Sequence, residues 1–360
     1  MPPATIDKDK DMAILTSLIH KETLHIVRDT RTMVITLLMP LVLLLLFGFA
    51  ISTEVNDIRI VAVADRHTDT TRDIIQRFRT NSYFTFMGMA SPAEVEPMLR
   101  HGEIDAAIFL RQDGTEMDAQ VIVDASNTTV AQASAAYVKG VLEGSPAHPP
   151  VLTYTLYNPQ LRSAYNFVPG IMGMIFILIC AIMTSVSIVS EKEDGTLDLL
   201  TVSPVRPGTV IIGKLIPYFV LSCIILAAML TMAYTLLGLP LSARAVDVVV
   251  VSLLYIILSL SVGLLVSTLA DTRLTALIVS AVLFMLPVIM LSGMIFPIDN
   301  MPRPLQWLSC AIPARWYTEA MRKLMIQQLT LGHVAREVMI LIGMTVVLLA
   351  VAVRKFNKSY

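Results

Sequence analysis

The sequence predicts an α-helical polytopic membrane protein with six transmembrane helices and a small α/β extracytoplasmic domain inserted after the first of them. Two observations lead to this fold class. The 360 residues are 55% hydrophobic and only 15% charged, with a mean hydropathy of +0.69, a balance too apolar for a soluble globular chain. Charge-free stretches of about 20 residues, the length of helix that crosses the hydrocarbon core, recur along the chain and leave one long polar region between the first two.

The N-terminal part is expected to form a cytoplasmic interfacial helix followed by the first span. Leu15, Ile19 and Ile26 share one helical face with lysine and arginine opposite, which suits a helix lying in the membrane interface. Glu22 interrupts that apolar face. The first apolar stretch is longer than the core of a signal peptide, and no small-residue cleavage site follows it, so we expect it to remain as an anchor.

The positions of charged residues and the lengths of the apolar stretches set the predicted bounds of the elements. The predicted order is the N-terminal interfacial helix at 1–31, a first span at 32–53, an extracytoplasmic α/β domain at 54–162, a bundle of spans two to six at 163–353, and a cytoplasmic tail at 354–360. Within the bundle, spans are expected at 163–190, 215–243, 248–270, 274–298 and 338–353, with a cytoplasmic loop at 191–214 and a re-entrant or interfacial segment at 297–335.

Residues 54–162 alternate between strand-like and helix-like pieces. Short β-branched or alternating runs predict strands: "IRIVAVAD", "DAAIFL", "AQVIVDAS" and "LTYTLY". The pieces "SPAEVEPMLRHG" and "NTTVAQASAAYVKGVLEG" begin at a Ser or Asn cap and end at glycine, as helices do. A small α/β domain is therefore expected, and no cysteine is present in it to form a disulfide framework.

Lysine and arginine in the short flanks predict the orientation. Those before the first span, between spans two and three, after span four and at the C-terminus fall on one side, which the positive-inside rule makes the cytoplasm. Both termini would then be cytoplasmic, in a multi-pass protein of the inner membrane. Four basic residues between spans five and six oppose this arrangement: Arg303, Arg315, Arg322 and Lys323. Because prolines break that segment and its tryptophans suit the headgroup level, we interpret it as re-entrant or interfacial helices.

The sequence contains no recognisable pattern for catalysis, metal binding or nucleic-acid binding. The net charge of −1, without a basic stripe, argues against nucleic acid as a partner. Gly208 to Leu215 reads G-x-x-x-x-G-K-L, but leucine replaces the Mg²⁺-binding hydroxyl of a phosphate loop, so chance is the better explanation. His20 and His25 project about 140° apart on a helix and cannot share a metal ion. The five long spans, as bounded above, contain no Asp, Glu, Lys, Arg or His, so no ion relay is expected.

The spans are rich in small residues and methionine. Gly170 and Gly173, with Ser259 and Gly263, allow helices to approach closely, and helix packing is the favoured interpretation. The alternative is an adaptable path for apolar cargo, lined by methionines such as Met172, Met174, Met183, Met285, Met290 and Met294.

The loop at 191–214 has the composition of a short docking helix. Glu191 to Asp194 would form its charged start, where the helix dipole favours acidic residues, and Pro204 would end it. From these residues alone, a solvated connector and a helix that docks on a partner are about equally compatible.

Four motifs are spread along the chain. The stretch E-[KR]-E-x-G-T-x-x-x-L-x-x-[ST]-P, followed by G-K, is matched at Glu191, Lys192, Glu193, Gly195, Thr196, Leu200, Ser203, Pro204, Gly213 and Lys214. A K-E-x-x-x-x-x-R-D start is matched at Lys21, Glu22, Arg28 and Asp29, and a Y-N-P segment begins at Tyr157. A proline-rich region is matched through Gly293, Pro297, Pro302, Trp307 and Pro313. Together these motifs resemble the permease subunits of ABC-2 type transporters, in the branch with a large extracytoplasmic domain after the first span.

The resemblance implies a transmembrane permease subunit of an ATP-driven exporter. Such a permease pairs with a second permease, identical or paralogous, and with two separate ATPase subunits that hold ATP and Mg²⁺. The chain itself would bind no cofactor and would not be an enzyme. The resemblance also assigns an ATPase-coupling helix, seated in a groove of the ATPase, to Glu191, Lys192, Glu193, Gly195, Thr196, Leu197, Leu200, Ser203 and Pro204. The N-terminal helix, with Lys21, Glu22, Arg28 and Asp29, would lie beside it.

The expected cargo is a hydrophobic or amphipathic, drug-like or toxin-like compound, because the spans are apolar and uncharged; export of a lipid or polysaccharide is the alternative. The lipid bilayer is a partner throughout, and a periplasmic adaptor protein is a further candidate. A membrane-anchored ligand-sensing or binding module would belong to a different class. Six spans and a motif-bearing inner loop exceed what an anchor needs.

Overall fold

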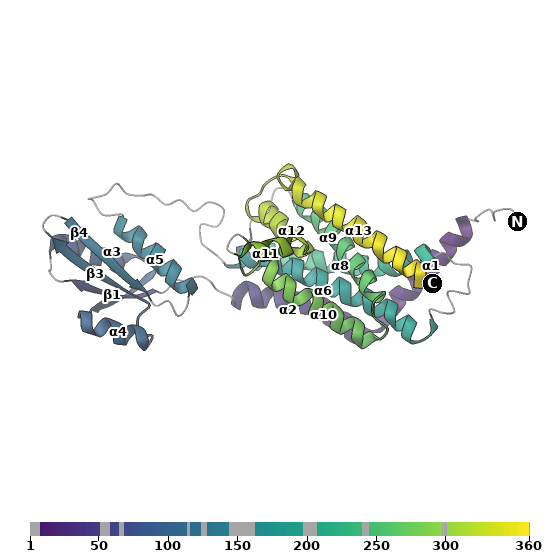
Figure 1. Cartoon of the computed structure of the whole chain (residues 1–360), viewed down its shortest axis with the longest axis horizontal. Helices are drawn as coiled ribbons and strands as arrows, with labels where there is room; N and C mark the ends of the chain where they lie inside the picture. Colours follow the sequence, from purple (N-terminus) through teal and green to yellow (C-terminus); the bar gives the residue numbers. More distant parts are fainter. Residues whose placement is uncertain are drawn as a thin grey trace. The chain divides into compact units, whose positions relative to one another are not determined.

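The computed structural model describes residues 8–50, 58–64, 68–113, 116–123, 128–143, 163–196, 207–239, 245–296, 298 and 301–359. The chain divides into two compact units, one made of residues 1–51 and 163–360 and the other of residues 52–162. Figure 1 shows the helices of the first unit and the sheet of the second. Each unit is described by itself below.

Among its described residues, the first unit has six helices long and apolar enough to cross a membrane. They are α2 (Thr30–Ala50), α6 (Ser163–Glu193), α8 (Pro207–Thr235), α9 (Ala245–Ser267), α10 (Arg273–Leu291) and α13 (Ala335–Ser359). With the inserted α/β unit they confirm the predicted fold class. Several helices run beyond the apolar stretches that predicted them, because a helix does not end where the membrane core ends. Lys214, Asp247 and Glu337 consequently lie within membrane-length helices.

Helices α6 and α9 form the centre of the bundle. Glycine makes this possible: a Cβ at Gly263 on α9 would lie 2.7 Å from Thr184 Cβ and 2.8 Å from the Ala181 carbonyl oxygen on α6. A Cβ at Gly173 would likewise lie 2.9 Å from the Tyr317 ring. The small residues therefore act in helix packing, as the favoured interpretation of the sequence proposed.

The outer helices α2, α10 and α13 present long apolar faces outside the bundle. Only about a fifth of each candidate span is buried there, against 72% for α6 and 67% for α9. Exposed leucine, isoleucine, valine and methionine side chains line these faces. Such surfaces are stable in contact with lipid, whose tails are as apolar as the side chains.

The segment after α10 folds as short helices: α11 (Arg303–Cys310), α12 (Pro313–Met321), the π-helix η2 (Arg322–Ile326) and the 3₁₀-helix η3 (Leu331–Val334). Proline starts both α-helices, with Pro302 at the N-cap of α11 and Pro313 within the first turn of α12. Helix α12 is buried against the bundle, whereas Trp307 on α11 is 76% exposed.

Three of the four basic residues that opposed the predicted orientation have partners within the fold. Arg322 Nη2 donates to the Gly293 carbonyl oxygen at 2.7 Å. Lys323 Nζ lies 2.7 Å from Glu337 Oε1 and 3.2 Å from Glu319 Oε1, and the Arg315 guanidinium lies over the Trp316 ring. Because these charges are used within the fold, they differ from the solvated loop charges to which the positive-inside rule applies.

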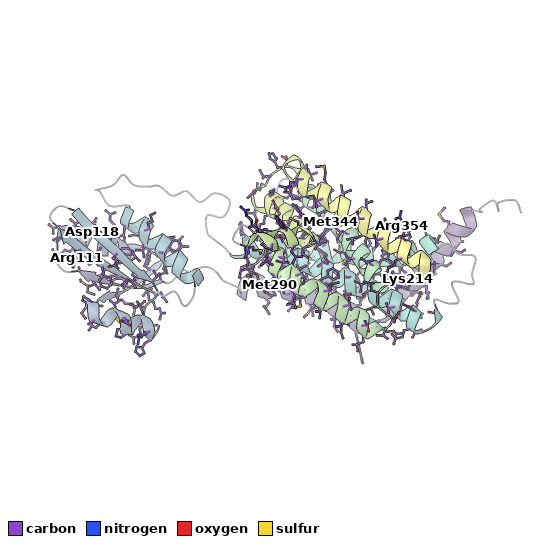
Figure 2. All side chains as sticks on the ribbon, viewed as in Figure 1. Arg111, Asp118, Lys214, Met290, Met344 and Arg354 are labelled. Carbon is purple, nitrogen blue, oxygen red and sulfur yellow. The ribbon has the colours of Figure 1, made fainter. Side chains whose placement is uncertain are left out.

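The second unit is a four-stranded sheet with helices on both faces. The strand order is β2 (Phe84–Met89), β1 (Ile58–Ala64), β3 (Ala106–Asp113), β4 (Glu116–Val123); β1 is parallel to β2 and β3, and β3 is antiparallel to β4. In the last ladder Arg111 lies opposite Asp118 (Figure 2). One face packs on α3 (Asp69–Thr80) and α5 (Thr128–Glu143), and the other on α4 (Pro92–Arg100).

The sequence pattern predicted β1, β3, β4, α4 and α5 but not α3 or β2. In α3, Ile74, Ile75 and Phe78 repeat at helical spacing and are buried against the sheet. Phe84 and Phe86 alternate along β2 and also pack in that core. Both signals are present in the sequence but are short and flanked by polar residues. The strand expected at 152–157 lies outside the described residues.

Candidate functional site

Helix α1 (Lys8–Arg28) packs along the start of α8, at the end of the bundle where α6 and α13 finish (Figure 1). The contact is close because Gly213 lacks a side chain: a Cβ there would lie 3.0 Å from Leu18 Cβ. The apolar face predicted for α1 is thus partly used against α8. Gly208 to Lys214 lie in the first two turns of α8, so this stretch is helix and not a phosphate-binding loop.

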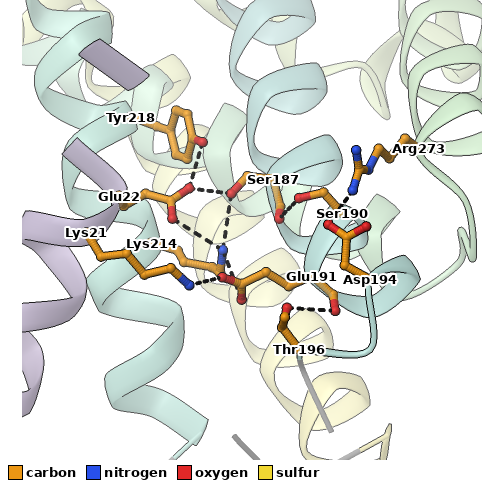
Figure 3. Close-up of polar contacts among 10 residues, drawn as sticks. All are labelled: Lys21, Glu22, Ser187, Ser190, Glu191, Asp194, Thr196, Lys214, Tyr218 and Arg273. Carbon is orange, nitrogen blue, oxygen red and sulfur yellow. Dashed lines mark hydrogen bonds and ion pairs between the residues drawn. The ribbon is translucent and has the colours of Figure 1, made fainter. Parts of the chain in front are cut away.

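Glu22 and Lys214 lie at the centre of a group that we call the ionic cluster: Lys21, Glu22, Ser187, Glu191, Lys214 and Tyr218 (Figure 3). Lys214 Nζ lies 3.5 Å from Glu22 Oε2 and 3.2 Å from Glu191 Oε2. The Tyr218 and Ser187 hydroxyls both donate to Glu22 Oε1, at 2.8 and 2.5 Å. The cluster therefore joins α1, α6 and α8 through ion pairs and charge-assisted hydrogen bonds.

The two central charges are nearly removed from solvent. Glu22 and Lys214 are each 5% exposed. Burial alone would raise the pKa of the Glu22 carboxyl, but Lys214, Ser187 and Tyr218 together hold that pKa below its usual value. Removing one partner of such a pair leaves an uncompensated buried charge, which costs about 3–5 kcal/mol. The glutamate that interrupted the apolar face of α1 is therefore the residue that fixes α1 to the bundle.

The sequence predicted that the acidic residues of the loop motif start a helix, but in the structure they end one. Glu191, Lys192 and Glu193 form the last turn of α6, and Gly195 ends the helix with φ +71°, a left-handed conformation that glycine adopts at low cost. Carboxylates at a helix C-terminus are disfavoured by the dipole and need cations nearby. Lys21 Nζ supplies one for Glu191, at 2.7 Å from Oε1.

A second group of charges, which we call the latch, lies on the other side of the same helix end: Lys192, Glu193, Asp194, Asp271 and Arg273. Lys192 pairs with Asp271, and the Arg273 guanidinium pairs with Asp194. The backbone N–H of Arg273 donates to Glu193 Oε2 at 2.9 Å, which caps the first turn of α10. The latch thereby ties the end of α6, which carries the first residues of the loop motif, to the start of α10.

A cavity of about 190 Å³ lies between α1, α6 and α8, beside the ionic cluster. All its lining residues are polar or charged, and they include Lys21, His25, Asp194 and Thr196. Its walls therefore suit polar side chains or water.

The predicted site residues fall into three places. Lys21, Glu22, Glu191, Lys192, Glu193, Gly195 and Thr196 gather at the end of α6, whereas Leu197, Leu200, Ser203, Pro204 and Pro297 lie outside the described residues. Arg28 ends α1, and Asp29 Oδ1 accepts the Thr32 N–H at 3.2 Å, which starts α2 and lowers the pKa of Asp29. Gly293, Pro302, Trp307 and Pro313 lie near the opposite end of the bundle, around α11 and α12.

Four residues of the ionic cluster and the latch were not predicted from the sequence: Ser187, Tyr218, Asp271 and Arg273. For the two charged residues a signal existed, since "ADTR" (270–273) is a short charged break between two long apolar runs and faces the same side as residues 191–214. For Ser187 and Tyr218 no signal existed, because serine and tyrosine are ordinary residues in an apolar helix.

Six membrane-length helices among the described residues, a helix α1 fixed by buried charges and a motif-bearing helix end are the features of a transport permease rather than of an anchored binding domain. The comparison with known families agrees: a model described as ABC-2 family transporter protein matches residues 30–354. The chain belongs to this family and is a transporter permease subunit of the inner membrane.

Relatives of known name cover most of the chain. It is 29% identical to the probable multidrug ABC transporter permease YbhR of Escherichia coli K12, over 89% of this chain and 92% of that one. It is 27% identical to the probable multidrug ABC transporter permease YbhS of the same strain, over 85% and 86%. The inner membrane transport permease YhhJ, also from that strain, is 22% identical over 68% and 69%. Family membership implies association with an ABC ATPase.

Proposed function

We propose that this chain is the transmembrane subunit of an exporter driven by two separate ATPase subunits. The observation that carries the proposal is the ionic cluster, which joins the end of α6 to α1 and α8 directly beside the loop motif. A displacement of the segment after α6 would act through paired, buried charges on three helices at once. ATP and Mg²⁺ would be bound by the ATPases, and this chain would bind neither.

The ATPase would contact residues 191–204, with Leu197 and Leu200 seated in its groove and acidic side chains fixing the register. Helix α1 would lie beside this contact, held by Glu22. In this arrangement the end of the bundle that carries α1 and the finish of α13 faces the cytoplasm, so both termini are cytoplasmic. The α/β unit would then lie on the periplasmic side, where an adaptor protein could contact it.

A second permease completes the transporter, either a copy of this chain or a paralogue. Hydrophobic or amphipathic drug-like compounds are the proposed cargo, supported by the uncharged faces of the spans and by the names of YbhR and YbhS. A lipid substrate is the second candidate, because the exposed apolar faces of α2, α10 and α13 already accommodate lipid chains.

The ATPase contact is tested by pull-down with tagged chain from solubilised membranes. Leu200→Asp should abolish recovery of the ATPase, because a carboxylate would replace a leucine buried in the groove. The matched control is Leu236→Asp, the same change at an exposed leucine just after α8, at the opposite end of the bundle. Equal recovery of ATPase with Leu200→Asp and with the unchanged chain would contradict the proposed contact.

The cargo is tested by measuring ATP turnover of the purified complex with added hydrophobic drug-like cations, phospholipids or sugars. Stimulation by the drug-like cations alone supports the proposed cargo. Stimulation by phospholipid alone would favour the second candidate.

A further inference from the structure

The latch has an unusual position, because it joins the coupling motif to the start of one particular helix, α10. Lys192 Nζ approaches both Asp271 and the Ala270 carbonyl oxygen, and the Arg273 side chain lies between Glu193 and Asp194. Unlike the ionic cluster, the latch is open to solvent, with the Arg273 side chain 48% exposed. Exposed ion pairs contribute only about 0–1 kcal/mol each. Stability therefore gives little reason for several charges to converge here.

Helix α10 lies at the edge of the bundle, with one main neighbour, α6. It packs chiefly on α6 and is only 22% buried over its apolar window. In its middle, the Ser280 and Ser185 hydroxyls share a hydrogen bond of 3.0 Å. Near the latch, Ala276 packs with Val189 and Ala270 in a small apolar cluster. Because α6 is its main neighbour, α10 can shift relative to α6 without displacing most of the other spans.

The far end of α10 is tied to the segment of short helices. Gly293, with φ +78°, turns the chain directly after α10, and its carbonyl oxygen accepts the Arg322 Nη2 hydrogen bond at 2.7 Å. The next residue, Met294, packs on α6 so closely that a Cβ at Gly170 would lie 2.4 Å from Met294 Cγ. Movement of α10 along its axis would therefore displace Met294 and the Arg322 contact.

We propose that α10 is the element that transmits the displacement of the coupling motif to α11 and α12, with Arg273 as the positioning residue at its inner end. This inference rests on the proposed function. The helix has 19 residues and is about 28 Å long at 1.5 Å per residue, so it reaches from one end of the bundle to the other. Its inner end, at Arg273, is held by solvent-accessible charges that a bound ATPase can rearrange. Its outer end, at Leu291, is held through the Arg322 hydrogen bond and the packing of Met294.

Cys310 provides a reporter for the outer end. The chain has three cysteines, and Cys310, the last residue of α11, is the exposed one. The experiment measures labelling of Cys310 by a membrane-impermeant maleimide in the complex with its ATPase, with and without ATP. Cys310→Ala shows how much labelling belongs to this thiol. The expected result is that ATP changes the labelling rate of the unchanged complex.

The variants tested are Arg273→Glu, Arg273→Gln and Arg273→Lys. Glutamate and glutamine should reduce the ATP-dependent change in labelling by roughly 2- to 30-fold, which is the fold-change that corresponds to the coupling free energies of such residues. ATPase recovery and ATP turnover should persist. Lysine keeps the charge and should restore most of the change. The control is Arg354→Glu, an exposed arginine of α13 at the same end of the bundle as Lys214 (Figure 2), which should behave as the unchanged chain.

The outcomes separate the two proposals. Failure of the ATPase to co-purify with the unchanged chain would overturn the proposed function. If the ATPase binds but ATP leaves Cys310 labelling unaltered, or if Arg273→Glu and Arg273→Gln keep the full change, the transmission through α10 is wrong. Size-exclusion chromatography identifies any variant that fails to fold. If Arg273→Glu fails to fold, the labelling result of Arg273→Gln decides whether α10 transmits the displacement.

Discussion

The end of α6 is held by two groups of charges that differ in their exposure to solvent. In the ionic cluster, Glu22 and Lys214 are each 5% exposed, and each has several partners. In the latch, the Arg273 and Asp194 side chains are about half exposed. Buried pairs are costly to break and exposed pairs are not. The comparison suggests that the cluster keeps α1, α6 and α8 together, while the latch is free to change during transport.

The largest expected effect comes from breaking the buried ion pair of the ionic cluster. Lys214→Met keeps the length of the side chain but leaves the Glu22 carboxylate buried without its cation. We expect a loss of about 3–5 kcal/mol of stability, measured by thermal unfolding of the purified chain in detergent. Lys214→Met combined with Glu22→Gln should recover much of that loss, because no uncompensated charge remains. Unfolding of Lys214→Met at the original temperature would show that the pair is not buried as described.

The second effect tests the close approach of α1 to α8. Gly213→Val should push Leu18 away, since even a Cβ at Gly213 would lie 3.0 Å from Leu18 Cβ. Overpacking of this kind costs about 1–3 kcal/mol, and α1 should become more accessible to protease. The matched control is Gly208→Val in the first turn of the same helix, where a Cβ would meet nothing within 4 Å. Similar proteolysis of both variants would contradict the packing.

The third effect concerns pH. The pKa of Glu22 is lowered in the folded chain, so its ionised form adds stability that is complete above the unfolded pKa of about 4.3 and is lost as the pH falls through the folded pKa. We expect the difference in melting temperature between the unchanged chain and Glu22→Gln to stay constant from pH 7 to pH 5 and to shrink in stronger acid. A difference that already falls between pH 7 and pH 5 would mean that the pKa is raised.

The smallest effect on stability is expected from changes in the latch, which is exposed to solvent. Arg273→Gln removes the ion pairs of Arg273 with Glu193 and Asp194 but keeps the Lys192–Asp271 pair and the backbone N–H that donates to Glu193. Its unfolding free energy should change by about 1 kcal/mol or less, and the change should vanish at high salt. A loss as large as that of Lys214→Met would remove the distinction between the two groups.

The six helices and most strands of the α/β unit followed from apolar length and alternation, because these patterns are set by the solvent that each residue meets. The place of Glu22 could be only half predicted: its interruption of an apolar face was visible, but its partner lies on α8, far along the chain. The acidic motif was placed at the start of a helix because composition alone does not show where α6 ends. Gly195 determines that end, through a positive φ that the sequence merely allows.

We propose that this permease is driven by ATPases on other chains. The mass and composition of the complex, purified from native membranes through a tag on this chain, test this directly. Two permease chains together with two ATPase chains are expected, and ATP hydrolysis should be lost when the ATPase is removed. A stable particle containing this chain without any nucleotide-hydrolysing partner would contradict this proposal.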